Sequence, residues 1–224
     1  YAHTRDAVVF AGTVLCSGYL LLFFGYVENY SLLVLAVGSF ASLGLLAARG
    51  IVSRWIVLFP LIGAIFFHIL GIVLAPSAVY LLLAGSRYEK RWGRQSRGTK
   101  TVIVVSSFLA VGAAFWYAAV QSLAFRISLL SLFESPFTVN GYTLLSMSHL
   151  IDLGNLFLIL LPGLPILILV LLKLPEKALL KLTEYRFLAM LSVCALFPVF
   201  VFDPKLGMPR DWDLFSFAAV PLTV

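Results

Sequence analysis

Long apolar runs with almost no charge recur along this chain and limit its fold more than any other feature. Of its 224 residues, 62% are hydrophobic and only 12% are charged, and the mean hydropathy is +1.04. So little charge cannot cover a water-soluble surface, which excludes soluble enzymes, secreted domains and disordered chains. The runs lie at Ala7–Tyr26, Ser31–Ala48, Ile56–Leu74, Pro76–Ser86, Thr101–Phe125, Leu156–Leu172 and Phe187–Phe202, and another begins near Leu214.

In lipid each run is expected to be a helix, because an open strand leaves backbone N–H and C=O groups without partners. With roughly 20 residues needed per crossing, we predict an all-α polytopic membrane protein of about seven transmembrane helices and the start of an eighth, with short interfacial helices. We interpret residues 1–224 as a single helical membrane domain. Because the chain starts at Tyr1 without Met and stops inside an apolar run, we expect it to be a fragment of a longer protein.

The stretch from Ile56 to Gly85 is too long for one ordinary span and short for two. Gly71, Pro76 and Ser77 lie near its middle and favour a break, so we predict a tight helical hairpin with an outer loop at Ile72–Ala75. The alternative is a single kinked helix, which would move every later loop to the opposite side of the membrane.

Charge placement favours the hairpin. With that topology all but three of the 16 Lys and Arg residues lie on one side, and the exceptions are Arg126, Lys205 and Arg210. Cytoplasmic loops carry such an excess of basic residues. We therefore expect an integral protein of the inner (plasma) membrane with a cytoplasmic N-terminus. The basic stretch at 87–100 and the lysines at 173–181 are interpreted as headgroup anchors that bind membrane lipids, and no nucleic-acid partner is expected.

The first candidate site lies at the outer mouth of the sixth run. His149, Asp152 and Asn155 are spaced at i, i+3 and i+6, which places them along one face of a helix. They are candidate substrate-binding residues. The structural alternative is an interfacial helix end in which the aspartate caps the helix or pairs with the histidine.

The second candidate site is the outer segment Asp203-Pro-Lys-Leu-Gly-Met-Pro-Arg-Asp-Trp-Asp. Asp211 and Asp213 are the candidate catalytic residues, flanking Trp212, and Arg210 with Trp212 is a candidate for substrate binding. Carboxylates beside a guanidinium suit deprotonation of a sugar hydroxyl, phosphate binding or a divalent metal ion. The structural alternative is that an aspartate caps the next helix while Trp212 lies in the interfacial aromatic belt. If the sixth and eighth helices are neighbours, the two candidate sites converge in one outward-facing pocket.

The segment Gly207-Met-Pro-Arg-Asp-Trp-Asp-Leu-Phe, together with His149-Leu-Ile-Asp-Leu-Gly-Asn, resembles the C-terminal membrane region of bacterial multi-span proteins that are similar to GT-C glycosyltransferases. The resemblance covers about a quarter of the chain in two patches. It implies an enzyme that transfers sugar from a polyprenyl-phosphate donor at the extracytoplasmic face. One departure is that the family carries paired acids in an early outer loop, where this chain has only Val27-Glu28-Asn29-Tyr30.

Two other functions are compatible with the sequence. A non-catalytic scaffold or accessory subunit of a membrane complex would use small-residue faces, such as Gly38 with Ser42, to contact protein partners. A transporter is less favoured, because no central run carries a charged residue of the kind that couples ions. An enzyme predicts an outer cavity lined by the named acids, whereas a scaffold predicts those acids paired within the protein or at a partner interface.

Overall fold

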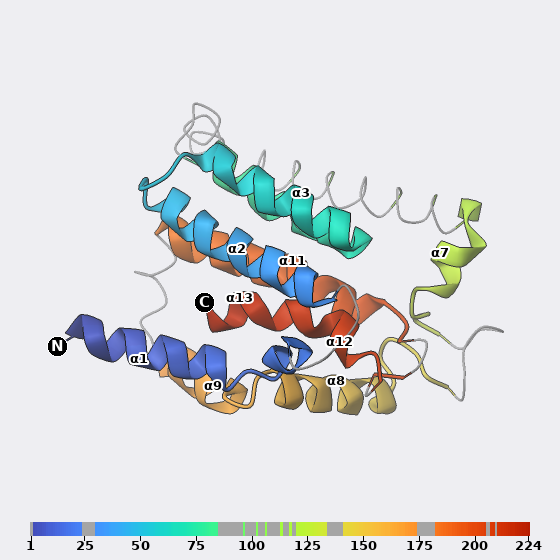
Figure 1. The fold of residues 1–224 in the computed structure, drawn as a ribbon. Coiled ribbons are helices and arrows are strands. Elements are labelled where there is room, and N and C mark those ends of the chain that lie inside the picture. Colours follow the sequence, from blue (N-terminus) through green and yellow to red (C-terminus); the bar gives the residue numbers. More distant parts are fainter. Residues whose placement is uncertain are drawn as a thin grey trace.

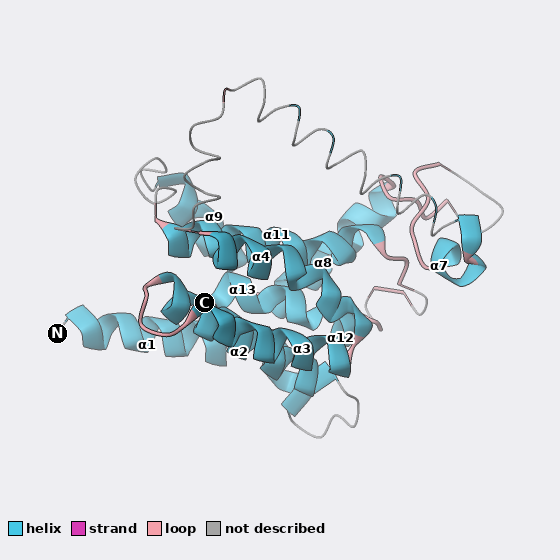
Figure 2. Ribbon diagram, turned by 90° about the horizontal axis from the view of Figure 1, so that it is seen from above, coloured by secondary structure: helices cyan, strands magenta, loops and turns pink. Residues whose placement is uncertain are grey.

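The computed structural model of the chain describes residues 2–23, 30–84, 120–133, 141–173, 182–204, 207–208 and 210–224, together with Ser96, Val102, Ser106, Ala113 and Tyr117. Within these ranges every regular element is a helix (Figures 1 and 2), so the predicted all-α class is confirmed. The predicted basic stretch at 87–100, most of the fifth run and the lysine-rich segment at 174–181 lie outside the described residues, Ser96 excepted.

Two long helices form the centre of the fold. α2 (Tyr30–Ala48) and α11 (Thr183–Val201) lie side by side, and their phenylalanines Phe40 and Phe187 pack edge to face at 5.8 Å. Gly44 near the end of α2 faces Phe187 near the start of α11, so the two helices run antiparallel (Figure 1). A side chain at Gly44 would overlap the Phe187 ring, which explains why a glycine is required here.

In the described part of the chain, only α2 and α11 are long and apolar enough to cross a membrane. A buried core helix or a signal sequence can have the same length and composition. The remaining apolar helices are shorter, at 10–17 residues. The structure thus supports an all-helical, membrane-compatible fold, while it does not support the seven spans expected from the sequence.

The predicted hairpin is present, with its break at a different residue. The first arm comprises η2 (Arg54–Val57) and α3 (Leu58–Phe67), and the second comprises η3 (Ile69–Leu74) and α4 (Ala75–Leu83). α4 returns to contact η2, so the second arm folds back along the first. The chain breaks at His68, whose backbone is extended, and not in the predicted loop at Ile72–Ala75. Gly71 allows the turn, because a Cβ there would meet the backbone of Ala64 at 2.5 Å.

Three other predicted runs have different bounds in the structure. The first is divided into α1 (Ala2–Leu15) and η1 (Gly18–Phe23). The sixth is divided into α8 (Met147–Leu160) and α9 (Leu164–Lys173), because Leu161 leaves the helical conformation just before Pro162 and Gly163. The eighth begins at Trp212 as α12 (Trp212–Phe215), followed by η4 (Ser216–Ala219) and α13 (Val220–Thr223). Near the fifth run, α7 covers Leu123–Ile127.

The C-terminal segment from α12 to α13 is the most deeply buried part of the described chain. Phe215, Phe217, Ala218 and Ala219 have no exposed surface. The segment contacts α2, α11, α1 and η1, so it occupies the middle of the helical layer (Figure 1). The residues expected to begin an eighth helix thus lie in the core of the described chain.

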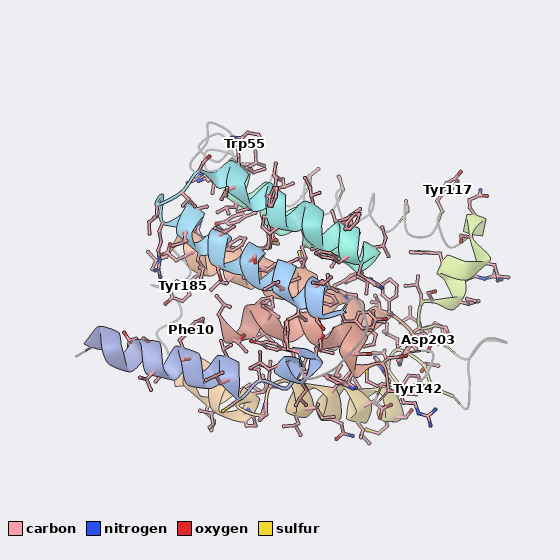
Figure 3. All side chains as sticks on the ribbon, viewed as in Figure 1. Phe10, Trp55, Tyr117, Tyr142, Tyr185 and Asp203 are labelled. Atoms are coloured by element: carbon pink, nitrogen blue, oxygen red, sulfur yellow. The ribbon has the colours of Figure 1, made fainter. Side chains whose placement is uncertain are left out.

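The two ends of the layer differ in charge. Trp55 and Tyr185 mark one end, and Tyr142 and Asp203 mark the other (Figure 3). The first end carries Arg49, Arg54 and Arg186, at or beside the ends of α2, η2 and α11. The opposite end, called the acidic end below, contains Asp152 at the start of α8 and Asp203 just after α11. This polarity agrees with the basic and acidic sides that the sequence predicts.

One face of α3 is an exposed apolar stripe. Phe59, Ile62 and Phe66 are 83%, 65% and 83% exposed, while Leu61 and Ala64 on the other face are buried. Large contiguous apolar surfaces are rare on water-soluble monomers. A helix that is apolar on both its buried and its exposed face is suited to contact with lipid.

Candidate functional site

The start of α8 is fixed by local hydrogen bonds that position His149. The Ser146 hydroxyl oxygen accepts the His149 backbone N–H at 3.3 Å, as an N-cap serine does. The same hydroxyl donates to the Thr143 carbonyl at 2.8 Å, which ties the helix to the preceding loop. In that loop Gly141 has a φ of +70°, a conformation that glycine adopts readily, and Tyr142 follows it.

His149 is fully buried and bridges α8 to the end of α11. Its Nε2 lies 3.2 Å from the Phe200 carbonyl oxygen. In a continuing helix that carbonyl would accept from residue 204, which is a proline without an N–H. The imidazole therefore supplies the donor that the chain itself lacks at this helix end.

Tyr142 connects His149 to Asp152. Its hydroxyl donates to Asp152 Oδ2 at 3.0 Å and lies 3.2 Å from His149 Nδ1. The two rings pack edge to face at 5.4 Å. Together with Asp203, these residues form what is called the polar cluster below: Tyr142, His149, Asp152 and Asp203. Figure 3 shows Tyr142 and Asp203 at the same end of the molecule.

Burial and nearby carboxylates shift the proton affinities of the polar cluster. Burial raises the pKa of Tyr142 well above its ordinary value of 10.0, and the hydrogen bond to Asp152 and the charges of Asp152 and Asp203 raise it further. Burial lowers the pKa of His149 from 6.5, although the Phe200 carbonyl and the two carboxylates act in the opposite direction. The charge of Asp203 thus acts on both rings, which places it within the cluster.

Backbone hydrogen bonds fix the described residues around Asp203 and Gly207. Asp203 N–H donates to the Ser128 carbonyl at 2.9 Å, and Leu130 N–H donates to Val201, so the loop after α7 is attached to the end of α11. Gly207, with a φ of +86°, accepts from the N–H groups of both Arg210 and Asp211. These bonds hold Gly207 close to Arg210 and Asp211, directly before α12.

The second set of predicted site residues has mixed surroundings. Arg210 is exposed, Asp211 and Trp212 are half-buried, and Trp212 packs against the core. Asp213 is only 5% exposed, and its Oδ1 accepts the Leu214 N–H at 2.7 Å. The Asp213 side chain therefore accepts a backbone N–H in the first turn of α12. This contact is structural, although it is not the N-cap bond that the sequence analysis gave as the alternative.

The structure brings part of the first predicted site together. His149 and Asp152 are joined through Tyr142, whereas Asn155 is exposed. The convergence of these residues with Arg210, Asp211, Trp212 and Asp213 in one pocket stays a prediction. Sequence reasoning did not select Tyr142 or Asp203 as site residues, and the available signal was their position in the two polar outer segments.

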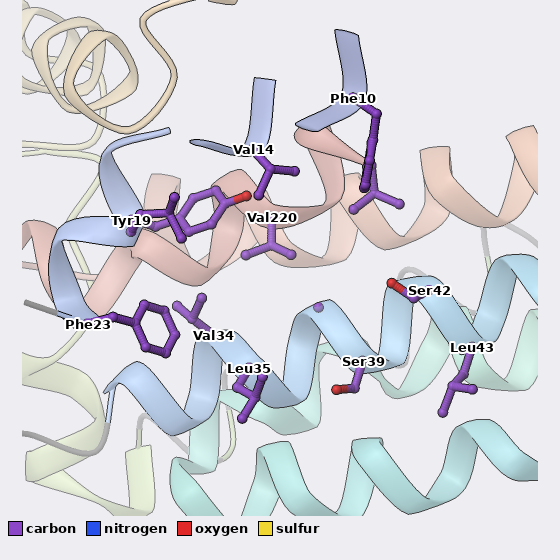
Figure 4. A pocket seen from close by; sticks show the side chains of 13 residues that line it. Phe10, Val14, Tyr19, Phe23, Val34, Leu35, Ser39, Ser42, Leu43 and Val220 are labelled. Atoms are coloured by element: carbon purple, nitrogen blue, oxygen red, sulfur yellow. The ribbon is translucent and has the colours of Figure 1, made fainter. Parts of the chain in front are cut away.

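An apolar groove lies beside the C-terminal segment (Figure 4). It has a volume of about 580 Å³ and is formed by α1, η1, α2 and α13. Its walls include Phe10, Val34 and Val220, and Ser39 and Ser42 supply polar atoms. Gly38 and Ser42, predicted as a helix-contact face, line this groove, where Gly38 faces Val220 of α13. Tyr19 in the wall is fixed by a hydrogen bond of 2.9 Å between its hydroxyl and that of Thr223.

Within the described residues, no group of three or more His, Cys, Asp or Glu side chains is placed to hold a metal ion. Comparison with protein-family models, with curated proteins and with solved structures gives no match to this chain. Three features of the described chain bear on function: the polar cluster, the segment Arg210–Asp213, called the acidic segment below, and the groove.

Proposed function

We propose that the chain is part of an integral membrane protein that acts at the extracytoplasmic face on a sugar linked to a polyprenyl phosphate. One observation carries the proposal: the C-terminal segment begins with Asp211 and Asp213 and then forms a wall of the apolar groove at Val220 and Val224. A rise of 1.5 to 2 Å per residue places Val220 roughly 10 to 14 Å along the segment from Asp213. A lipid phosphate beside the acids can therefore place its tail toward the groove.

The groove is suited to a lipid tail. Its volume of about 580 Å³ lies in the range of small-molecule sites, and its walls are almost entirely apolar. The exposed apolar stripe on α3 and the membrane-compatible helices α2 and α11 favour a lipid environment. A polyprenyl chain partitions into such a groove through the hydrophobic effect, without directional contacts.

The acidic segment offers the polar groups that sugar transfer needs. Arg210 is exposed and suited to hold the donor phosphate through paired N–H groups. Asp211 is the better candidate base, because it is half-exposed, whereas the Asp213 side chain is buried and already accepts a backbone N–H. The acceptor hydroxyl would lose its proton to Asp211 as its oxygen bonds to the sugar C1, and the bond from C1 to the phosphate oxygen breaks.

A second candidate is the non-catalytic scaffold or accessory subunit. It is favoured by the internal hydrogen bonds of the acids, because Asp152 is bonded to Tyr142 and Asp213 to the Leu214 N–H. The described groove is also lined by none of the predicted site residues. A scaffold would use the same fold without binding the lipid phosphate at Arg210.

Lipid retention separates the two functions. The complete chain is purified in nanodiscs containing polyprenyl phosphate and, in a parallel sample, the uncharged polyprenol, and retained lipid is counted by native mass spectrometry. We expect preferential retention of the phosphate, reduced about tenfold in Arg210→Gln, since a charge-assisted contact contributes about 1.5 kcal/mol. Arg186→Gln is the matched control, an exposed arginine at the opposite end. Equal retention of both lipids by all variants would support the scaffold instead.

A further inference from the structure

The contacts of His149 determine where one of its protons lies. A carbonyl oxygen only accepts hydrogen bonds, so the 3.2 Å contact with Phe200 requires a proton on His149 Nε2. Nδ1 on the other side of the ring faces the Tyr142 hydroxyl at 3.2 Å. In a neutral imidazole this nitrogen is a pure acceptor and needs the Tyr142 proton.

Tyr142 has one hydroxyl proton and two acceptors next to it. The hydroxyl lies 3.0 Å from Asp152 Oδ2 as well as 3.2 Å from His149 Nδ1. With a neutral imidazole and an ionised carboxylate, one proton cannot serve both contacts. One of the two short contacts would then lack a hydrogen, in a place where His149 is fully buried and unmade hydrogen bonds are costly.

We propose that Tyr142, His149 and Asp152 form a proton-binding site that takes up one proton beyond those the three side chains carry in neutral solution. The added proton completes a hydrogen-bonded chain from Asp152 through Tyr142 and His149 to Phe200. It is held on His149 Nδ1, which donates to Tyr142 while Tyr142 donates to Asp152, or on Asp152, which donates to Tyr142 while Tyr142 donates to Nδ1. Both arrangements have the same proton count and zero net charge, and every contact contains a hydrogen.

The surroundings set the direction of the pH dependence. Asp152 and Asp203 are the charged groups that act on His149, and both favour the added proton. Burial acts against it and is the larger effect, so the pKa of His149 lies below 6.5. Among the elements that contact α8, η1 contributes Tyr19, which is bonded to Thr223, and η4 contains no titratable residue. α11 meets His149 at Phe200, and its titratable residues Glu184, Tyr185, Arg186 and Cys194 lie in earlier turns of that helix. The site therefore fills as the pH falls below neutral.

Filling the site strengthens the connection between three parts of the acidic end. Tyr142 belongs to the loop before α8, His149 and Asp152 to α8, and Phe200 to the last turn of α11. The chain continues from Phe200 to Asp203, whose backbone N–H donates to the Ser128 carbonyl. Filling the site thus acts on the backbone at the end of α11, independently of whether Arg210 binds a lipid phosphate.

The test is a pH titration of the complete chain in nanodiscs with ¹⁵N-labelled histidine. The His149 signals are identified by their loss in His149→Gln, and protonation of Asp152 is followed by infrared difference spectra against Asp152→Asn. In the wild type we expect one proton to bind below pH 6.5, detected at His149, at Asp152 or shared between them. We expect Tyr142→Phe to lower that midpoint by about one pH unit, because the connecting hydrogen bond is lost. Tyr185→Phe, at an exposed tyrosine of the opposite end, should leave it unchanged.

Two results would overturn the proposal. One is a wild type in which His149 stays neutral and Asp152 stays ionised at every pH where the protein is folded, which needs no variant. The other is a folded Tyr142→Phe protein with the same His149 titration as the wild type, because the hydroxyl would then not connect the two groups. Neither result depends on the lipid-retention experiment, so this proposal and the proposed function can fail separately.

Discussion

His149 completes the end of α11 from a different helix: its Nε2 lies 3.2 Å from the Phe200 carbonyl oxygen, where Pro204 offers no N–H. The contact is partly buried and joins residues 51 positions apart in the sequence. It therefore fixes how the start of α8 and the end of α11 lie against each other. His149, at the mouth of a predicted span, thus makes a structural contact that joins two helices at the acidic end.

Truncating this side chain should destabilise the fold strongly. We expect His149→Ala to lower the free energy of unfolding by about 2 to 4 kcal/mol, because it removes a fully buried side chain, opens a cavity and leaves the Phe200 carbonyl without its donor. The measurement is equilibrium unfolding in mixed micelles by circular dichroism. Asn155→Ala, on an exposed position of the same helix, should stay within about 0.5 kcal/mol of the wild type. Equal stability of the two variants would show that the Phe200 contact contributes little.

Tyr142 should make the fold sensitive to alkaline pH. Its pKa in the folded protein is raised above the ordinary value of 10.0, so the fold stabilises the neutral phenol. That contribution is complete below pH 10 and is lost as the pH rises through the higher folded pKa. Unfolding at pH 8 and pH 11 should show a larger loss of stability for the wild type than for Tyr142→Phe. Identical losses in the two proteins would contradict the half-buried, hydrogen-bonded position of the hydroxyl.

The contact between α2 and α11 can be tested at two glycines. Gly44→Ala should cost about 1 to 3 kcal/mol, because the new Cβ overlaps the Phe187 ring in a packed core. Gly63→Ala in α3 has open space around its Cβ and should be neutral or stabilising by up to about 1 kcal/mol. Thermal unfolding in the same detergent ranks the two variants. If Gly63→Ala were the more harmful change, the described packing of α2 on α11 would be incorrect.

His68 should stabilise the turn of the hairpin. Its Nδ1 accepts the Leu70 N–H at 3.2 Å at the start of η3, and its ring packs on Tyr30 at 5.8 Å. We expect His68→Ala to cost about 1 kcal/mol through loss of the cap, and His68→Asn to recover a part of it, since asparagine is a good cap residue. Both values come from the unfolding measurement used for Gly44. An asparagine variant no better than alanine would argue against a capping role.

Hydrophobic runs and charge bias were sufficient to predict the all-α class, the hairpin and the difference in charge between the two ends of the helical layer. They were insufficient for element bounds, because apolar composition does not reveal where backbone geometry changes. His68 breaks the hairpin although Gly71 and Pro76 are the stronger signals, and Leu161 ends α8 inside an apolar run. The start of the eighth run was predicted as the opening of another span, whereas it packs at the centre.

For the candidate site, helical spacing correctly placed His149 beside Asp152 but could not find the residue that joins them. Tyr142 precedes α8 and reaches both through a turn at Gly141, which is a tertiary contact without periodicity. The capping alternative is not confirmed: Asp211 is the N-cap residue of α12 and makes no side-chain cap hydrogen bond, while Asp213 accepts the Leu214 N–H from within the helix. The roles of Arg210 and Asp211 in binding a substrate stay predictions.

The most direct test of the proposed function is photo-crosslinking with a polyprenyl phosphate that carries a diazirine in its first isoprene units. The complete chain in nanodiscs is irradiated, and the labelled peptides are identified by mass spectrometry. We predict labelling of groove residues such as Val34 and Val220, and a loss of most of it in Ser42→Phe, which fills the groove. Leu32→Phe, exposed on the same helix outside the groove, should label like the wild type. Labelling spread over the outer face of α3 and unchanged by Ser42→Phe would contradict a lipid-phosphate site in this protein.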